Sequence, residues 1–247
     1  MEKVLNVLKF GLQILFPKTC LVCGRNYDYI CPACEGVIEY VDKFVCLVCH
    51  RPAFDGFVHI NCLSKFTPNR FLAAFMYKGP IRRALVNAKY RGKIFDLYGR
   101  LCPLAASYFD EIGLEIGKDA VLIPIPVHYK KYMKRGFNHA EIVAELWSKH
   151  YGVSCVDALK KVKETETQSL LNRKERKESV EGAFEVRSEL LNKISGKDVV
   201  LVDDIATTGA TFLEASKTLR KLGSRGPRFI YCMALAYDAR RDIIRSG

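Results

Sequence analysis

The sequence predicts an α/β fold, in which a central, mostly parallel sheet is flanked by helices, with a small cysteine-rich module at the N-terminus. Seven of the ten cysteines lie between residues 20 and 62. Beyond about residue 68, apolar runs of strand length alternate with helical patterns, which is typical of a parallel sheet covered on both faces. We therefore expect two domains, residues 1–66 and residues 67–247.

The composition is that of a globular protein with an excess of positive charge. The chain of 247 residues is 49% apolar, with a formal net charge of +12 and a pI near 9.2. This charge suggests an anionic partner such as nucleic acid, a phosphorylated metabolite or a membrane surface, without choosing among them. No apolar run approaches the roughly 20 residues that span a bilayer, so we expect no transmembrane segment.

The first twenty residues look at first like a signal peptide. However, Glu2 precedes Lys3, Lys9 interrupts the apolar run, and no small-residue cleavage site follows. The apolar residues recur at helical spacing, which predicts an amphipathic helix docked on its own domain rather than a membrane anchor. They are Val4, Leu5, Leu8, Leu12 and Leu15. We expect a cytoplasmic protein, in which cysteines stay reduced and clustered ones bind metal.

The clustered cysteines have the spacing of paired metal-binding knuckles. The predicted ligands of a first zinc are Cys20, Cys23, Cys31 and Cys34, and those of a second are Cys46, Cys49, His59 and Cys62. Each pair separated by two residues presents two ligands to one metal, and two pairs complete a tetrahedron. Four protein ligands leave no position for water, which favours structural zinc over catalytic zinc. The zinc would stabilise a module too small for a good core of its own.

The second cluster leaves two alternatives open. His50 adjoins Cys49 and competes with His59 as the histidine ligand, and metal could also be shared between knuckles in a crossed arrangement. One or two zinc ions are therefore expected. The three remaining cysteines stand among apolar residues and are expected to be core residues; they are Cys102, Cys155 and Cys232.

The second domain shows five strand patterns and three helix patterns. The strands are expected at 71–77, 120–127, 153–156, 199–202 and 229–236, and the helices at 80–90, 139–150 and 209–222, with Gly223 stopping the last. The polar stretch 160–184 is too long for an ordinary connection, which indicates a functional or disordered loop.

The stretch VVLVDDIATTGAT (199–211) contains the most informative pattern. Asp203 and Asp204 follow four apolar residues, at the strand end where α/β sheets bind ligands. Two adjacent acids there repel each other and are costly to desolvate, which suggests that they bind a ligand. The following small and hydroxylated residues lead into a helix, whose N-terminal N–H groups suit a phosphate. A ribose 5-phosphate matches this layout, with hydroxyls for the acids and a phosphate for the loop.

This segment resembles the phosphoribosyl pyrophosphate (PRPP) motif of type I phosphoribosyltransferases. The resemblance implies the fold of those enzymes, with Asp203 and Asp204 holding the ribose 2′- and 3′-hydroxyls and contacting Mg²⁺ through water. It also implies a loop around the 5′-phosphate, formed by Ile205, Ala206, Thr207, Thr208, Gly209, Ala210 and Thr211. The alternative is that the two acids only cap a helix.

Two further segments are similar to parts of the same superfamily. Residues 123–141 resemble the strand and turn that hold pyrophosphate, which implies contacts from Val127, His128, Lys130 and Lys131. Residues 168–184 resemble the mobile loop that closes over PRPP, where Arg173 and Lys174 would neutralise the leaving group. His128 could instead be an ordinary surface histidine.

The chain as a whole resembles the ComF family of competence-associated proteins. The shared segments are Cys-x-x-Cys-Gly at 20–24, Lys-Tyr-Arg-Gly at 89–92, Pro-x-Pro-x-His at 124–128, Arg-Gly-Phe-Asn-His at 135–139, Gln-Ser-Leu at 168–170 and Gly-Ala-Phe at 182–184. The resemblance implies a role in DNA uptake during natural transformation, alongside other DNA-uptake proteins. In this family the second ribbon commonly ends in Cys-x-x-Cys, whereas here His59 replaces one cysteine.

The sequence leaves open whether the chain is an enzyme. A phosphoribosyltransferase would release pyrophosphate, but no acceptor pocket is recognisable. The alternative is a non-catalytic protein that binds single-stranded DNA and keeps the PRPP site as a ligand sensor. Its candidate contacts are Arg82, Arg83, Lys89, Tyr90, Arg91, Lys93, Lys134 and Arg135, unless they form only a solvated basic surface. The oligomeric state also stays open, although loops of related transferases often reach across a homodimer.

Overall fold

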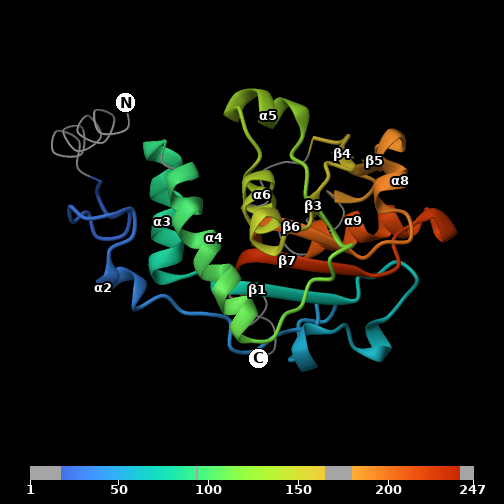
Figure 1. The fold of residues 1–247 in the computed structure, drawn as a ribbon, viewed down its shortest axis with the longest axis horizontal. Helices are drawn as coiled ribbons and strands as arrows, with labels where there is room; N and C mark the ends of the chain where they lie inside the picture. The colour runs from blue at the N-terminus through green and yellow to red at the C-terminus, as the bar shows by residue number, and fades with distance from the viewer. Residues whose placement is uncertain (1–17, 93, 165–179, 240–247) are drawn as a thin grey trace.

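The main sheet of the computed structural model, which describes residues 18–92, 94–164 and 180–239, has five strands in the order β1-β7-β6-β2-β3 (Figure 1). These strands are β1 (Arg70–Met76), β2 (Val121–Pro124), β3 (Ser154–Cys155), β6 (Val199–Ala206) and β7 (Ile230–Tyr237). All of their pairings are parallel, so the predicted α/β class is confirmed. The helix expected near the N-terminus lies outside the described residues.

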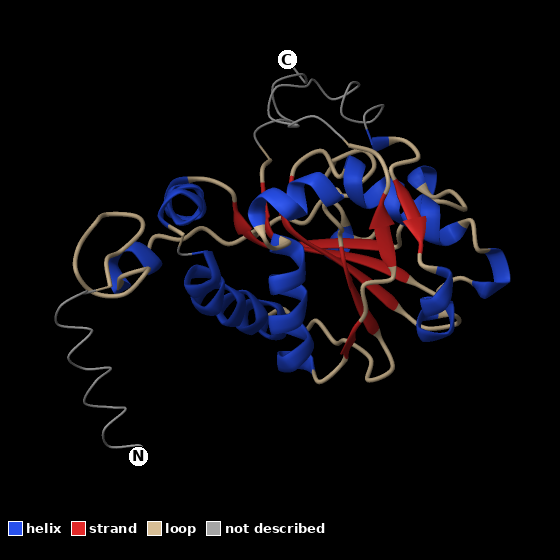
Figure 2. Cartoon of the chain, turned by 90° about the horizontal axis from the view of Figure 1, so that it is seen from above, coloured by secondary structure: helices blue, strands red, loops and turns tan. Residues whose placement is uncertain are grey.

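The sheet separates the core into two layers, as the residues of the central strand β6 show. Val200 and Val202 share a buried cluster with α3 (Gly79–Arg91), α4 (Ile94–Glu111) and α6 (His139–Tyr151). Val199 and Leu201 share the other cluster with α9 (Ala210–Arg220). Because successive strand residues point to opposite faces, this alternation buries both faces of the sheet between helices (Figure 2).

Several elements were not predicted or have different bounds. Helix α4 was missed because Pro103 stands in its interior, which argues against a helix. The stretch 160–184 is not all loop, since β4 (Leu159–Lys161) and β5 (Phe184–Val186) at its ends form an antiparallel pair. Helix α9 ends at Arg220 instead of running to residue 222. The remaining helical pieces are α2 (Pro32–Glu35), α5 (Tyr129–Arg135), α8 (Leu191–Ile194) and short 3-10 turns at Phe54–Gly56, Ile60–Cys62, Ser188–Leu190 and Gly223–Arg225.

The N-terminal module contacts the main domain at two separate places. Residues around Leu21 and α2 join the cluster of α3 and α4, whereas Val41 and Leu47 join the cluster of α9. Figure 1 shows the chain passing from α2, beside α3 and α4, to the segment near β1. Within the described part of the chain, no helix has the length and apolar character required to cross a membrane.

Candidate functional site

The two adjacent acids lie within β6 and not beyond its end. The strand continues from Val202 through both carboxylates to Ala206, paired in register with β7. Asp203 Oδ1 accepts a hydrogen bond from Asp204 N, and Asp204 Oδ1 accepts one from Ile205 N, each at 2.9 Å. These bonds fix the two carboxylates at the carboxyl edge of the sheet, where ligands of α/β proteins bind.

A buried pair of side chains anchors Asp204. His139 Nδ1 lies 3.0 Å from Asp204 Oδ2, and the Tyr98 hydroxyl donates to the same oxygen at 3.1 Å. Phe137 stacks on the His139 ring with 5.2 Å between the ring centroids. Tyr98 and His139 are themselves buried, so this end of Asp204 is shielded from water. The carboxylate therefore has little freedom to move away from the sheet edge.

The two acids have different proton affinities. Burial alone would raise the pKa of Asp204, but the hydrogen bond and charge of His139, and then the charge of Lys89, hold it below its usual value. Burial and the neighbouring negative charge of Asp204 instead raise the pKa of Asp203 well above its usual value. Asp204 is therefore a firmly ionised carboxylate. The ionised form of Asp203 beside it would be stabilised by a hydrogen-bond donor or a cation.

The local sequence explains how His139 reaches Asp204. Asn138 caps α6, because its Oδ1 accepts from Ala140 N at 3.2 Å, and its Nδ2 donates to the Ile125 carbonyl at 2.9 Å. Gly136, at a φ of 78°, ends α5 just before this cap. We assigned no role to His139 or Tyr98 from the sequence. The motif at 135–139 could have indicated a role for His139. Tyr98 had no such signal, because it lies on α4, which was not predicted.

The predicted phosphate loop joins β6 to α9. Gly209 has a φ of 67° and precedes the first helical residue, and no side chain of the described residues caps the helix. The first N–H groups of α9 therefore form a site suited to an anion. Thr208 is buried, whereas Thr207 and Thr211 are partly exposed. The three apolar residues of the loop contact the core. Ala206 and Ala210 belong to one buried cluster, and Ile205 packs against the other.

The predicted pyrophosphate turn lies beside the acid pair. His128 follows Val127, precedes α5, and pairs with Lys161 of β4. Its buried Nδ1 has no hydrogen-bond partner among the described residues, which is unusual for a buried polar atom. Lys130 forms an exposed ion pair with Glu164 at 2.7 Å.

Lys161 of β4 pairs with His128 of this turn, although we assigned it no role from the sequence. Burial and then the charge of Lys131 lower the pKa of Lys161 to about 8, against the opposing charge of Asp203. The charge of Lys161 therefore interacts both with that of Lys131 in α5 and with that of Asp203. In the sequence, Lys161 was marked only by its place in a run of basic residues. Arg173 and Lys174 lie outside the described residues.

Of the predicted nucleic-acid contacts, Lys89, Tyr90 and Arg135 line one pocket beside His139. Arg82, Arg83, Lys89 and Tyr90 are exposed on α3, whereas Lys134 and Arg135 are exposed at the end of α5. Arg91 belongs to α3, and Lys93 lies outside the described residues. A pocket of about 450 Å³ opens between the two helices; it is lined by Val86, Lys89, Tyr90, Arg135, Phe137 and His139. Because His139 also contacts Asp204, this pocket adjoins the acid pair.

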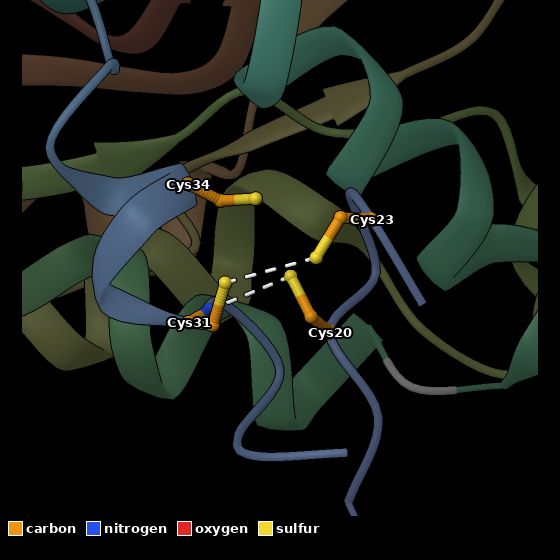
Figure 3. A group of neighbouring side chains, drawn as sticks. All are labelled: Cys20, Cys23, Cys31 and Cys34. Carbon is orange, nitrogen blue, oxygen red and sulfur yellow. Dashed lines mark hydrogen bonds between the residues drawn. The ribbon is translucent and has the colours of Figure 1, made fainter. Parts of the chain in front are cut away.

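The first cysteine cluster has the geometry of a tetrahedral metal site. The sulfur atoms of Cys20, Cys23, Cys31 and Cys34 all lie within 4.8 Å of one another and face a common centre (Figure 3). Burial opposes ionisation of Cys20, but backbone N–H groups led by those of Cys23 and Cys31 lower its pKa to about 6. A thiolate stabilised in this way suits zinc.

The second cluster contains His59 and not His50. The ligand atoms of Cys46, Cys49, His59 and Cys62 also lie within 4.8 Å of one another. His59 Nε2 is 3.0 Å from the Pro52 carbonyl, while its Nδ1 faces Cys49 Sγ at 3.2 Å. A hydrogen bond from Nε2 leaves Nδ1 available as a metal ligand. His50 Nδ1 lies instead 3.3 Å from the Tyr237 hydroxyl, and each cluster is formed by its own two pairs, without crossing.

Comparison with known proteins gives matches to both parts of the chain. Residues 133–243 match the phosphoribosyl transferase domain, and residues 11–63 match the double zinc ribbon domain. The fold and these two matches define a class: phosphoribosyltransferase-domain proteins with an N-terminal double zinc ribbon. The ribbon match and the two clusters together indicate structural zinc.

Three curated relatives identify the family more closely. DNA utilization protein YhgH of Escherichia coli is 26% identical over 90% of this chain and 98% of its own length. Competence protein ComFC of Bacillus subtilis is 25% identical over 83% of this chain and 89% of its own. Competence protein F of Haemophilus influenzae is 36% identical, over 41% of this chain and 44% of its own. The chain belongs to the ComF family, as the sequence motifs predicted.

Proposed function

We propose that this protein binds PRPP or ribose 5-phosphate together with Mg²⁺ and acts in the handling of DNA during its uptake. The ligand assignment rests on one observation: Asp203, Asp204 and the phosphate loop follow one another along a single segment that runs from β6 into α9. The DNA context is supported by the relatives, which are named competence and DNA utilization proteins. A cytoplasmic location belongs to the same proposal, because clustered cysteines placed to bind metal are typical of a reducing compartment.

In this proposal each part of the site has one task. Asp204, held by His139 and Tyr98, accepts a hydrogen bond from one ribose hydroxyl, and Asp203 accepts one from the neighbouring hydroxyl. The start of α9 binds the 5′-phosphate through backbone N–H groups. His128 and Lys161 meet the pyrophosphate. Bound Mg²⁺ would neutralise charge between the pyrophosphate and the ribose hydroxyls, and the two carboxylates are suitable oxygen ligands for it or for its waters.

Calorimetry tests this assignment directly. PRPP with Mg²⁺ is titrated into wild-type protein and into Asp203→Asn. We expect heat with wild type and at least tenfold weaker binding for the variant, which corresponds to about 1.4 kcal/mol. Asp198→Asn is the matched control, because Asp198 adjoins the opposite end of β6 and pairs with Arg228 at 2.8 Å. No heat with wild type, or equal loss in both variants, would contradict the proposal.

The same site would support phosphoribosyl transfer if a nucleophile were present. The bond between ribose C1 and the pyrophosphate oxygen would break, and a bond from an entering nitrogen to C1 would form. Pyrophosphate release from PRPP, followed with a panel of bases and amines, measures this activity. Release no faster than the spontaneous hydrolysis of PRPP would leave binding as the function.

A second candidate function is the binding of single-stranded DNA by the pocket between α3 and α5. Tyr90 is 87% exposed and offers a free ring face for a base, while Lys89 and Arg135 offer charges for phosphates. This location would bring a DNA end close to Asp204.

Affinity for a fluorescent oligonucleotide, measured against salt, tests the second candidate. We expect binding that weakens steeply as salt rises. We also expect Tyr90→Ala to lose about 1–3 kcal/mol, the range found for a stacked base. Tyr27→Ala is the control, since Tyr27 is also exposed but lies in the first ribbon. Equal affinity of both variants would exclude this pocket.

A further inference from the structure

We propose that Leu47 is a positioning residue that couples the second metal cluster to the phosphate loop. This inference rests on the proposed function for the ligand, a 5-phosphorylated pentose. Leu47 lies between two predicted ligands of the second zinc, Cys46 and Cys49. It is only 1% exposed and belongs to the buried cluster of Ala206, Ala210 and Phe212, which flank the phosphate loop.

The contact with the loop is close. A Cβ atom added at Gly209 would lie 2.5 Å from Leu47 Cδ1 and 2.9 Å from Leu47 Cγ. Real Cβ contacts are not that short, so the Leu47 side chain fills the space directly against the Gly209 backbone. Glycine is therefore favoured at position 209 for two reasons: the φ of 67° suits a residue without a side chain, and the Leu47 side chain occupies the space that a Cβ atom would need. The side chain thus supports the turn from which the N–H groups of α9 are presented.

A second contact joins the same knuckle to the sheet. His50 Nδ1 lies 3.3 Å from the hydroxyl of Tyr237, the last residue of β7. Tyr237 is paired in register with Ala206, at the start of the phosphate loop. The knuckle therefore contacts the loop directly through Leu47 and the adjoining strand through His50. Metal that holds the knuckle in shape would hold the loop as well.

The first knuckle provides an internal comparison. Both knuckles have the sequence Cys-Leu-Val-Cys, and Leu21 occupies the position equivalent to Leu47. Leu21 is 2% exposed, but it belongs to the other cluster, and its carbonyl accepts a hydrogen bond from Asn87 of α3 at 2.7 Å. Leu21→Ala should therefore match Leu47→Ala in lost packing without acting on the phosphate loop.

The first experiment compares Leu47→Ala with Leu21→Ala in the full chain. Zinc content is measured in each, and ribose 5-phosphate with Mg²⁺ is titrated by calorimetry. We expect unchanged zinc content in both, about tenfold weaker binding for Leu47→Ala, and binding within about twofold of wild type for Leu21→Ala. Leu47→Met, which nearly conserves volume, should restore most of the affinity. Equal affinities of the two alanine variants would overturn the inference.

A second experiment uses the wild-type protein and so does not depend on a variant folding. The partition of zinc between the protein and a competing colorimetric chelator is measured at equilibrium, with and without ribose 5-phosphate. Because coupling between two sites is reciprocal, the ligand should raise the zinc affinity of the second cluster severalfold and leave that of the first unchanged. His59→Ala identifies the zinc that belongs to the second cluster. Ligand binding without any change in zinc affinity would overturn the coupling, whereas absent binding would contradict the proposed function instead.

Discussion

At the scale of single residues, the two acids of β6 are held in different protonation environments. His139 and Tyr98 satisfy one oxygen of Asp204, whereas the pKa of Asp203 is raised by burial and by Asp204 itself. A folded-state pKa below its unfolded value means that Asp204 stabilises the fold above about pH 4 and loses this contribution as the pH falls. For Asp203 the sign is opposite, because ionising it costs stability as the pH rises.

These signs predict opposite effects of two neighbouring substitutions. Asp203→Asn should raise the free energy of unfolding at pH 7, because it removes the cost of ionising a buried carboxyl beside Asp204. Asp204→Asn should lower it by about 1–3 kcal/mol, because His139 loses its charged partner. Urea unfolding measures both, and repeating it near pH 4 should shrink the gain of Asp203→Asn. Loss of stability in both variants would refute the assignment.

Lys161 predicts the pH dependence of ligand binding. With a pKa of about 8, its ammonium is charged at pH 7 and increasingly neutral above pH 8. Affinity for PRPP, whose pyrophosphate Lys161 is proposed to contact, should therefore fall as the pH rises from 7 to 9, by at most about tenfold per unit for one required proton. Binding titrations at several pH values measure this fall.

Lys161→Met should bind more weakly at pH 7 and show a flat profile up to pH 9. Lys163→Met is the control, because Lys163 is exposed and donates to the Glu181 carbonyl at 2.7 Å. A fall in affinity that persists in Lys161→Met would assign the titration to another group.

At the scale of elements, the start of α6 connects the end of β2 to the acid pair. Asn138 caps the helix and also donates to Ile125, just beyond β2. His139 is the next residue, so an error in the helix start displaces the partner of Asp204. The cap thus contributes both to stability and to the geometry of the site.

Asn138→Ala should cost about 1 kcal/mol or more of stability, as cap removal does elsewhere, and should also weaken ligand binding. Asn138→Asp is the matched variant, because it keeps the acceptor for Ala140 N but replaces the donor to Ile125 with a charged carboxylate oxygen. Unfolding and ligand titrations should place it between wild type and the alanine variant. Wild-type ligand affinity in Asn138→Ala would show that the cap does not position His139.

At the scale of the whole molecule, the cysteine-rich module is built into two different parts of the core. The first cluster packs with α3 and α4, and the second with the phosphate loop and α9. We expect two zinc ions per wild-type chain and one in His59→Ala, by elemental analysis. One zinc in the wild type would argue against the second site.

Removal of zinc should loosen the module before the sheet. The five-stranded sheet is buried on both faces by helices, whereas the described part of the module contains mostly turns and short helical pieces. After chelation, limited proteolysis should cut first between residues 18 and 66, while the fragment containing β6 and β7 persists. Simultaneous loss of both parts would indicate that zinc stabilises the whole fold.

The sequence by itself determined the features that depend on neighbours along the chain. Knuckle spacing predicted both ligand sets, and apolar runs predicted β6 and β7 because strand formation and metal spacing are local properties. The choice of His59 over His50, however, depended on how the chain folds back beside Pro52. The bounds of β6 also needed the structure, because pairing with β7 extends the strand through both acids.

Only the tertiary structure decided what surrounds those acids. Tyr98 and His139 lie 106 and 65 residues from Asp204 in the chain, and packing of α4 and α6 on one face of the sheet brings them to it. Leu47 likewise meets Gly209 only because the second knuckle docks beside α9. Contacts of this kind follow from the packing of distant segments, which local patterns of residue type do not specify.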